Sequence, residues 1–343
     1  MEPIKFIQPS QVFYWEKCPL KAVFSAEYKD RPLFPKHPDL ELGSLIHLFY
    51  QKKKEWAINS EESFEEKWRA EIEKIDQAYL ASKLQKIYYP IKWYSKYYSV
   101  KKALLKKAIL KDYKHQKSGS AVNILREQWR DDRKDIGGKI DYMVLNEKND
   151  VIEIGDIKTG KIFEFNGKKK VIKVSYVKQL LLYAYIIKSK QDFYPKCFIK
   201  NIGGNKHELE IDENVISLEI EKAIALKKRI NKCIESSDYS SLANPILENC
   251  LNCDYRPICD QYKKKYLNSF DNKRVDIYGE VIEIWGVNKL EIKILTTIKT
   301  ILLKGITCND EIVIGDKIYV YNLFCPDGES QILYAMKQTI IKK

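Results

Sequence analysis

The side chains best suited to chemistry lie in two short runs near the middle of the chain. Gly138-Lys139-Ile140-Asp141 is followed by Asp156-Ile157-Lys158-Thr159-Gly160, which supplies two carboxylates and one ammonium group. Hard cations such as Mg²⁺ and Mn²⁺ prefer carboxylate oxygens. A lysine beside such an ion can orient a water or stabilise a pentavalent phosphoryl group. The residue types therefore suit hydrolysis of a phosphodiester.

Strand periodicity places these groups together. Residues two apart share one face of a strand, and here these are Ile152, Ile154, Asp156 and Lys158. Asp141 is expected on the preceding strand, so a hairpin register can bring it to Asp156, and the carbonyl of Ile157 can add a ligand. Taken alone, the Asp156/Lys158 pair is more typical of an exposed ion pair. The Gly-Gly turn before Asp141 and the Thr-Gly after Lys158 favour the site.

Three further polar side chains are candidates for the same site. Gln179 and Tyr183 stand four apart on an expected helix, Tyr176 extends their face, and the pair can reach a phosphate backbone. Alternatively, Tyr183 is ordinary core and Gln179 is solvated. His47 follows Gly43 on an otherwise apolar helix. It is either a core histidine or a metal ligand or proton carrier for the carboxylates.

The cysteines divide into a cluster and scattered residues. Cys250-x-x-Cys253-x₅-Cys259 offers three ligands close together, and Cys18, far away in the chain, is the natural fourth. Tetrahedral zinc and an iron–sulfur cluster both fit four thiolates, and the spacing does not choose between them. The other four are expected to be buried, unreactive thiols: Cys197, Cys233, Cys308 and Cys325.

Composition restricts the class of protein. Lys and Arg number 60 against 47 Asp and Glu, and a net charge of +13 favours a polyanionic partner, most commonly nucleic acid. A Lys-rich, AT-biased genome is the alternative source of that charge. We find no signal peptide and no apolar stretch long enough for a bilayer, so a soluble, cytoplasmic protein without membrane contact is expected. Eight cysteines in such a chain argue against a disulfide scaffold.

The elements that must position these residues follow from the periodicity. Helices are expected over 11–27 and 43–54, and several more over 61–117. The period then changes from near 3.6 to near 2, which predicts strands over 121–133, 137–146 and 150–158. A helix over 171–188, a strand over 194–202, a helix over 216–236 and a short helix over 261–268 follow. The fold class is therefore mixed α/β, with a helical insertion over about 55–117.

A second domain is expected after residue 268. Five strands separated by Gly, Asn and Asp turns are predicted over 275–284, 289–296, 301–307, 317–324 and 332–341. Five short strands in so small a region fit an OB-like barrel. The domains are thus 1–268 and 269–343. The barrel strands carry mainly Ile, Val and Leu, so they suggest no stacking face, and the barrel can equally dock a partner protein.

A basic, aromatic stretch lies in the helical insertion. Lys86–Lys117 carries ten lysines and one acid, and its first half holds Tyr88, Tyr89, Trp93, Tyr94, Tyr97 and Tyr98. Cations neutralise phosphates and aromatic rings stack on unpaired bases. The alternative is a helical hairpin whose aromatics pack inward and whose lysines are merely solvated.

Taken in order, the motifs resemble a known family. Gly43-x₃-His47, Gly138-x-x-Asp141, Asp156-x-Lys158-Thr-Gly and Gln179-x₃-Tyr183 are similar to those of the RecB family of PD-(D/E)XK nucleases, over residues 5 to 265. The resemblance implies an αβββαβ restriction-endonuclease-like core. It also implies His47, Asp141 and Asp156 as metal ligands, Lys158 as the catalytic lysine, and DNA contacts by Gln179 and Tyr183. Glu127 is a weaker acidic candidate. One departure is the Lys139-Ile140-Asp141-Tyr142 run, where relatives usually carry an arginine beside the acid.

The same resemblance extends to the cysteines. AddB-type, exonuclease V and CRISPR-associated RecB-like nucleases carry one cysteine before the core and C-x₂-C-x₅-C after it, and they bind a [4Fe–4S] cluster. Cys18, Cys250, Cys253 and Cys259 match those positions. The resemblance therefore implies an iron–sulfur cluster that clamps the two ends of the nuclease domain.

Together these features predict a Mg²⁺- or Mn²⁺-dependent deoxyribonuclease, most plausibly an exonuclease acting on single-stranded DNA or DNA ends in repair, recombination or defence. One alternative is a catalytically weak RecB-like module that binds DNA or a partner. Another is a zinc-stabilised nucleic-acid-binding protein without activity. No Gly-x₄-Gly-Lys-Ser/Thr run occurs, so a helicase or other nucleic-acid-processing partner would have to unwind duplexes. Polarity, DNA or RNA preference and pathway remain open.

Overall fold

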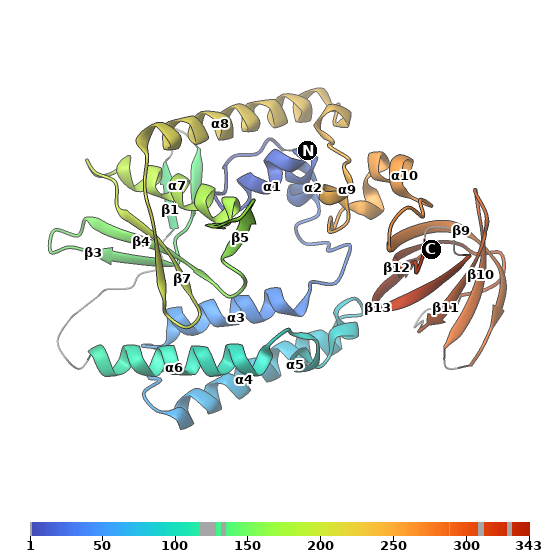
Figure 1. The fold of residues 1–343 in the computed structure, drawn as a ribbon, viewed down its shortest axis with the longest axis horizontal. Coiled ribbons are helices and arrows are strands. Elements are labelled where there is room, and N and C mark those ends of the chain that lie inside the picture. The colour runs from blue at the N-terminus through green and yellow to red at the C-terminus, as the bar shows by residue number, and fades with distance from the viewer. Residues whose placement is uncertain (1, 117–127, 132–134, 288, 308–311, 328–330) are drawn as a thin grey trace. The chain divides into compact units, whose positions relative to one another are not determined.

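The computed structural model describes residues 2–116, 128–131, 135–287, 289–307, 312–327 and 331–343 (Figure 1). The chain divides into two compact units, and each is treated by itself. The first comprises residues 1–27 and 35–242, and the second comprises residues 28–34 and 243–343. No helix in the described ranges is long and apolar enough to cross a membrane.

A four-stranded mixed sheet organises the first unit. Its order is β3 (Tyr142–Leu145), β4 (Val151–Lys158), β7 (Lys196–Asn201) and β8 (Lys206–Leu209). The β3–β4 and β7–β8 pairs are antiparallel and the β4–β7 pair is parallel. Parallel neighbours need a crossover, and helix α7 (Val174–Lys188) supplies it. Because the sheet is covered on both faces, the second half of β4, residues 154–157, is buried throughout, and Asp156 is the polar side chain within it.

Two hydrophobic clusters cover the two faces of this sheet. On one face, Ile154 and Ile199 pack with the apolar side of α7, which in turn contacts α8 (Glu213–Ser236). On the other face, Ile157 and Ile202 join a cluster from α3 (Pro38–Lys52), α4 (Glu61–Ala81) and α6 (Tyr98–Gln116). Figure 1 shows these helices as two separate groups on either side of the strands. The end of β4 is therefore held from both sides.

Shorter elements complete the first unit. Helices α1 (Val12–Lys17) and α2 (Leu20–Glu27) precede α3, while η1 (Gln85–Tyr88) and α5 (Ile91–Tyr94) connect α4 to α6. Strands β1 (Gln128–Asp131) and β2 (Ile136–Lys139) form one antiparallel ribbon, and β5 (Phe163–Asn166) and β6 (Lys169–Ile172) form another. The turn η2 (Ser240–Leu242) ends the unit.

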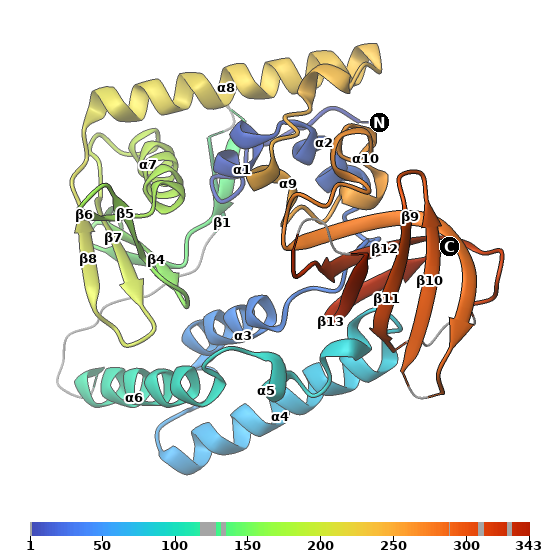
Figure 2. The same ribbon diagram turned by 45° about the vertical axis from the view of Figure 1, so that its right-hand side comes forward.

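The second unit contains a closed five-stranded barrel (Figure 2). Its strands are β9 (Arg274–Trp285), β10 (Leu290–Thr296), β11 (Thr300–Ile306), β12 (Lys317–Phe324) and β13 (Ile332–Lys342). They are ordered β10-β11-β13-β12-β9, and only the β11–β13 pair is parallel. Inward-pointing Ile, Val and Leu side chains fill the interior. Closure leaves no unpaired sheet edge.

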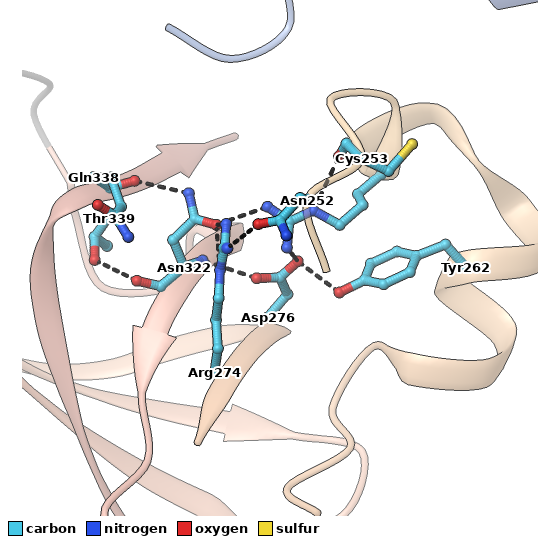
Figure 3. A network of polar contacts seen from close by, with 9 residues as sticks. Asn252, Cys253, Tyr262, Arg274, Asp276, Asn322, Gln338 and Thr339 are labelled. Atoms are coloured by element: carbon cyan, nitrogen blue, oxygen red, sulfur yellow. Dashed lines mark hydrogen bonds and ion pairs between the residues drawn. The ribbon is translucent and has the colours of Figure 1, made fainter. Parts of the chain in front are cut away.

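A segment with three cysteines precedes the barrel and belongs to the same unit. It contains α9 (Leu247–Cys250), η3 (Arg256–Ile258) and α10 (Asp260–Tyr266). The buried Arg256 pairs with Asp276 of β9 at 3.1 Å and donates to Asn322 of β12 at 2.6 Å. Its Nε also donates to the carbonyl of Cys253 at 3.2 Å. The segment is therefore fixed to the barrel by a buried polar network, part of which Figure 3 shows.

Tyrosines gather on the outer face of the barrel, although its sequence suggested no stacking face. Tyr278 and Tyr319 are cross-strand partners with ring centroids 4.4 Å apart, and Tyr321 follows on β12. Lys263 of α10 lies 5.2 Å from the Tyr319 centroid, and Phe34 packs edge-on against Tyr321. These rings thus already have partners within their own unit.

Several expected elements differ from the observed ones. The mixed α/β class and the five barrel strands are confirmed, whereas the OB-like identity of the barrel stays a proposal. The expected helix over 11–27 is broken at Cys18-Pro19, because proline cannot continue a helix that precedes it. The expected strand over 137–146 is divided between β2 and β3. The two compact units divide at residue 242/243, with the cysteine segment in the second, and the domain boundary at 268 stays a prediction.

Candidate active site

A pocket of about 570 Å³ opens in the first unit beside the end of β4. It is lined by Phe6, Gln8, Ser10, Ser44, His47, Gly137, Gly138, Lys139, Asp141, Asp156, Lys158, Gln179 and Tyr183. All six side chains that the sequence singled out for catalysis are therefore in one cavity. They come from α3, the β2–β3 junction, β4 and α7, which are far apart in the chain.

The two aspartates meet through the register of β3 and β4. Tyr142 pairs with Gly155, so the residue before Tyr142 and the residue after Gly155 are opposite one another. These residues are Asp141 and Asp156. The backbone amide of Ile157 also donates to Asp141 Oδ2 at 3.3 Å, which ties the β2–β3 junction to β4. Because β2 ends at Lys139 and β3 begins at Tyr142, Asp141 lies between the two strands and lines the pocket, outside the hydrogen-bonded strand pairs.

His47 contacts Asp141 from helix α3, which covers the face of the sheet that α7 does not cover. It lies on α3, whose first turn is capped by His37, and its Nδ1 is 3.2 Å from Asp141 Oδ2. A side chain at Gly43, one turn earlier, would bring its Cβ to 3.3 Å from Thr159 Oγ1. The small residue thus lets α3 approach the end of β4 closely enough for His47 to contact the aspartate.

Asp156 is a buried acid in the pocket with a strongly raised pKa. It is 4% exposed, and burial raises its pKa to about 7, with the neighbouring Asp141 carboxylate adding to the rise and the Lys158 ammonium opposing it. Burial disfavours the charged form, and a second carboxylate disfavours it further. Lys158 forms an ion pair with Asp156 Oδ2. Even so, this oxygen is buried without a well-formed hydrogen bond from the described residues.

Helix α7 positions the lysine through two side chains. Lys158 Nζ donates to Gln179 Oε1 at 3.1 Å and lies 4.4 Å from the centroid of the Tyr176 ring. An ammonium over an aromatic face is stabilised by the ring quadrupole. Gln179 is itself buried, so the lysine is held at three points: Asp156, Gln179 and Tyr176.

Tyr183 contacts the backbone beside Asp141. Its hydroxyl donates to the carbonyl of Lys139 at 2.8 Å, and the side chain is 4% exposed. A Cβ at Gly138 would be 2.8 Å from this hydroxyl, so the position has no room for a side chain. The glycine at 138 and the tyrosine at 183 are therefore in direct contact, and each residue type depends on the other. The DNA contact implied for Tyr183 stays a prediction.

The donor set fits a hard cation in part. Two neighbouring carboxylates repel each other in the buried pocket, and a divalent ion between them would relieve that repulsion. Oδ2 of Asp156, which has the Lys158 ammonium beside it but no well-formed hydrogen bond from the described residues, could serve as an oxygen ligand. However, the described residues contain no group of three or more His, Cys, Asp or Glu arranged to hold a metal ion. The set His47, Asp141, Asp156 and the Ile157 carbonyl therefore stays a proposed ligand set.

The cysteines give a less complete picture. Cys18 caps α1 in the first unit, whereas Cys250, Cys253 and Cys259 lie in the second. None of the seven cysteines in the described ranges forms a disulfide. As expected, Cys197 and Cys325 are buried, and burial raises the pKa of Cys197 to about 12. Cys233 is only partly buried, 3.5 Å from Ser241 Oγ, and Cys308 lies outside the described residues.

Sequence reasoning missed one wall of the pocket and named one residue that cannot be placed. Gln8 and Ser10 line the cavity because Ile7 bridges Ile136 in parallel and extends the β2 ribbon. A single bridging isoleucine carries no distinctive sequence pattern. Glu127, the weaker acidic candidate on the first strand, lies outside the described residues.

Comparison with known proteins identifies one family. The family model described as "PD-(D/E)XK nuclease superfamily" matches residues 7–260. None of the curated proteins matches the chain.

Solved structures give only weak likenesses. A Eubacterium rectale protein named "Putative exonuclease" has 13% identity and a TM-score of 0.40, covering 76% of this chain and 88% of its own. The tetrameric p202 HIN2 structure has 15% identity and a TM-score of 0.18, covering 20% of this chain and 40% of its own. At TM-scores below 0.5 neither likeness establishes a shared fold.

Proposed function

This chain belongs to the PD-(D/E)XK nuclease superfamily, and from that membership we propose that it is a Mg²⁺- or Mn²⁺-dependent deoxyribonuclease. Its substrates are single-stranded DNA or DNA ends, and its action is that of an exonuclease. The observation that carries the proposal is the pocket in which Asp141, Asp156 and Lys158 meet. A pathway in repair, recombination or defence, including CRISPR adaptation, agrees with that activity.

The acidic residues have the role of binding and the lysine that of charge stabilisation. His47, Asp141, Asp156 and the Ile157 carbonyl would hold the cation. When bound, the ion supplies Lewis-acid activation of the scissile phosphate and lowers the pKa of water. The Lys158 ammonium can neutralise negative charge that develops on the phosphoryl oxygens. Gln179 and Tyr176 keep that ammonium in place, and His47 can carry a proton beside Asp141.

The proposal is tested by cleavage of a labelled single-stranded oligonucleotide with Mn²⁺, compared with the same reaction in EDTA. We expect cleavage with the metal and none with the chelator. Separate Asp141→Ala, Asp156→Ala and Lys158→Ala variants should bind the oligonucleotide but not cut it. Cleavage that survives all three substitutions would contradict the assignment of the site.

A second candidate is a module of the same family that binds DNA or a partner with little catalysis. It is favoured by the fact that the described residues contain no ready group of three metal ligands, and by the Asp156–Lys158 ion pair within the pocket. Oligonucleotide binding without cleavage in Mg²⁺ and in Mn²⁺ would support this candidate over the nuclease.

A [4Fe–4S] cluster on Cys18, Cys250, Cys253 and Cys259 is also proposed, on the resemblance of their spacing. Iron and acid-labile sulfide in anaerobically purified protein would support it, and stoichiometric zinc without iron would overturn it. We further propose that the barrel is of the OB type, which its strand order and its parallel β11–β13 pair support. A helicase is the proposed partner for duplex substrates.

A further inference from the structure

The aromatic residues between η1 and α6 divide into a packed set and an exposed set. Tyr88, Tyr94 and Tyr98 join the hydrophobic cluster of the helical insertion, where Trp68 Nε1 donates to the Tyr98 hydroxyl at 2.7 Å. In contrast, Tyr89 is 40% exposed, Trp93 is 73% exposed and Tyr97 is 75% exposed. Exposed apolar side chains carry meaning when they gather in one region, and these three lie on one short connector. Three of the six rings therefore pack inward, as in a helical hairpin, and the other three are exposed and accessible for stacking.

The lysines divide in the same way. On α6, Lys101 pairs with Asp39 at 3.3 Å and Lys106 pairs with Glu61 at 2.9 Å, and Lys102 pairs with Glu65. These cations hold α6 to α3 and α4.

The exposed lysines that lie among the exposed aromatics are Lys86, Lys92 and Lys96. Within the described residues none of the three side chains forms an ion pair. Lys92 Nζ instead lies 5.9 Å from the centroid of the Trp93 ring. Positive charge that no described carboxylate neutralises is thus concentrated where the rings are exposed.

The backbone that carries the exposed set is fixed. Ile91 is fully buried, and its amide donates to Asp76 Oδ1 of α4 at 2.8 Å. The amide of Lys96 donates to Asp39 Oδ1 of α3 at 2.8 Å. The backbone between η1 and α6 that carries the rings is therefore already ordered. Binding then costs little additional backbone entropy.

We propose that Tyr89, Trp93 and Tyr97, with Lys86, Lys92 and Lys96, form a binding surface for single-stranded nucleic acid; the inference rests on the proposed function for the identity of its ligand. Exposed rings stack on bases whose faces are free, and the lysines neutralise the phosphates between them. A duplex hides its base faces inside the stack. The surface therefore favours single strands over duplexes in binding, before any bond is cut.

Binding measured without cleavage separates this surface from the active site. The full chain is titrated, in EDTA, into fluorescein-labelled oligodeoxythymidylate and into a blunt duplex of equal length, with anisotropy as the readout. The Trp93→Ala/Tyr97→Ala variant should bind the single strand at least about 10-fold more weakly, because each stacked base contributes about 1–3 kcal/mol. Its duplex affinity should change by less than about twofold.

Two controls are matched to these changes. Trp285 of β9 is also exposed, at 41%, and Trp285→Ala should leave single-strand affinity unchanged. For the charges, Lys92→Gln/Lys96→Gln should reduce the salt dependence of binding by about 1.4, since each phosphate contact to a single strand contributes about 0.7. Lys102→Gln, which removes a lysine paired with Glu65, should change that slope by much less.

The outcomes distinguish the surface from the nuclease activity. Unchanged single-strand affinity in Trp93→Ala/Tyr97→Ala overturns the surface, even if the protein cleaves DNA with Mn²⁺. Selective loss of single-strand affinity supports the surface, even if no cleavage is found. If the variant instead alters only self-association, measured by light scattering, the rings belong to an interface between copies and the proposal is wrong.

Discussion

Two buried aspartates, one in each unit, are surrounded very differently. Asp276 in the barrel is 1% exposed, and its Oδ2 accepts from Tyr262 at 2.6 Å and pairs with Arg256 at 3.1 Å. Its Oδ1 accepts from the amide of Asn322 at 2.8 Å (Figure 3). Asp156 is 4% exposed, yet its Oδ2 has only the Lys158 ammonium beside it among the described residues, and a second carboxylate close by.

The difference separates a structural acid from one proposed to be functional. A buried carboxylate whose oxygens are all satisfied stabilises the packing around it. A buried carboxylate with one ammonium beside it and another acid close by is disfavoured in its charged form, and such arrangements concentrate at functional sites. Burial alone would rank the two aspartates as equivalent, so the hydrogen-bond inventory is what distinguishes them.

The largest expected effect is on catalysis. Asp156→Asn should reduce Mn²⁺-dependent cleavage by at least about 1,000-fold, because it removes a proposed cation ligand and the partner of Lys158. A gel assay with a labelled single strand measures the loss. Glu153→Gln changes an acid on the same strand that pairs with Lys206 outside the pocket, and it should retain activity. Equal losses in both variants would remove the distinction between the two acids of β4.

The next effect concerns the satisfied aspartate. Asp276→Asn should destabilise the second unit by about 3–5 kcal/mol, because it leaves the buried Arg256 without its counter-ion. Chemical denaturation followed by tryptophan fluorescence measures the change, and Trp285 reports on the barrel. If Asp276→Asn unfolds at the wild-type midpoint, the network contributes far less than its geometry suggests.

The pH dependence of the metal-free protein should reveal the strained acid. Because the pKa of Asp156 is raised from 3.8 to about 7, its folded form keeps a proton that the unfolded form loses. Its contribution to stability is complete below about pH 4 and is lost as the pH rises through about 7.

Asp156→Asn should remove that dependence, and in EDTA at pH 8 it should melt several degrees above the wild type, for a difference on the order of 3 kcal/mol. Added Mn²⁺ should raise the wild-type melting temperature and leave the variant unchanged. A variant that melts lower than the wild type in EDTA would contradict the unfavourable burial of this carboxylate.

The smallest expected effect is at Tyr183. Tyr183→Phe removes one hydrogen bond to the Lys139 carbonyl and should cost about 0.5–1.5 kcal/mol in stability. Cleavage should fall only a few-fold, through a displaced Asp141, and should recover at higher Mn²⁺ concentration. A loss of oligonucleotide binding that metal does not restore would instead favour direct contact with DNA.

Sequence patterns predicted the parts of this molecule that repeat along the chain. Period-2 alternation and turn residues located all five barrel strands, and β12 (Lys317–Phe324) has the expected bounds. The same alternation predicted a strand over 150–158, and β4 is observed over Val151–Lys158. The six catalytic candidates could be named because glycines and polar residues stand at fixed distances from these elements.

Other features depend on contacts between distant residues and leave little local pattern. The β5–β6 ribbon and β8 have four residues per strand, too few for alternation to be diagnostic. Tyr88 and Tyr94 pack against the hydrophobic cluster of α3 and α4, whereas their neighbours Tyr89 and Trp93 are exposed. Local sequence does not show which ring of each pair is buried. The charges of Lys101 and Lys106 appeared available in sequence, and only the packing of α6 against α3 and α4 shows them neutralised.

The bond between Arg256 and Asp276 decides how this protein can be dissected. A fragment that ends at residue 268 would retain Arg256 but lose Asp276 and Asn322. The guanidinium, which is buried and paired in the full chain, would then lack its counter-ion. A fragment ended at Leu242 leaves the pair intact on the other side of the cut. We therefore expect the shorter fragment, which ends at Leu242, to be more stable than the one that ends at residue 268.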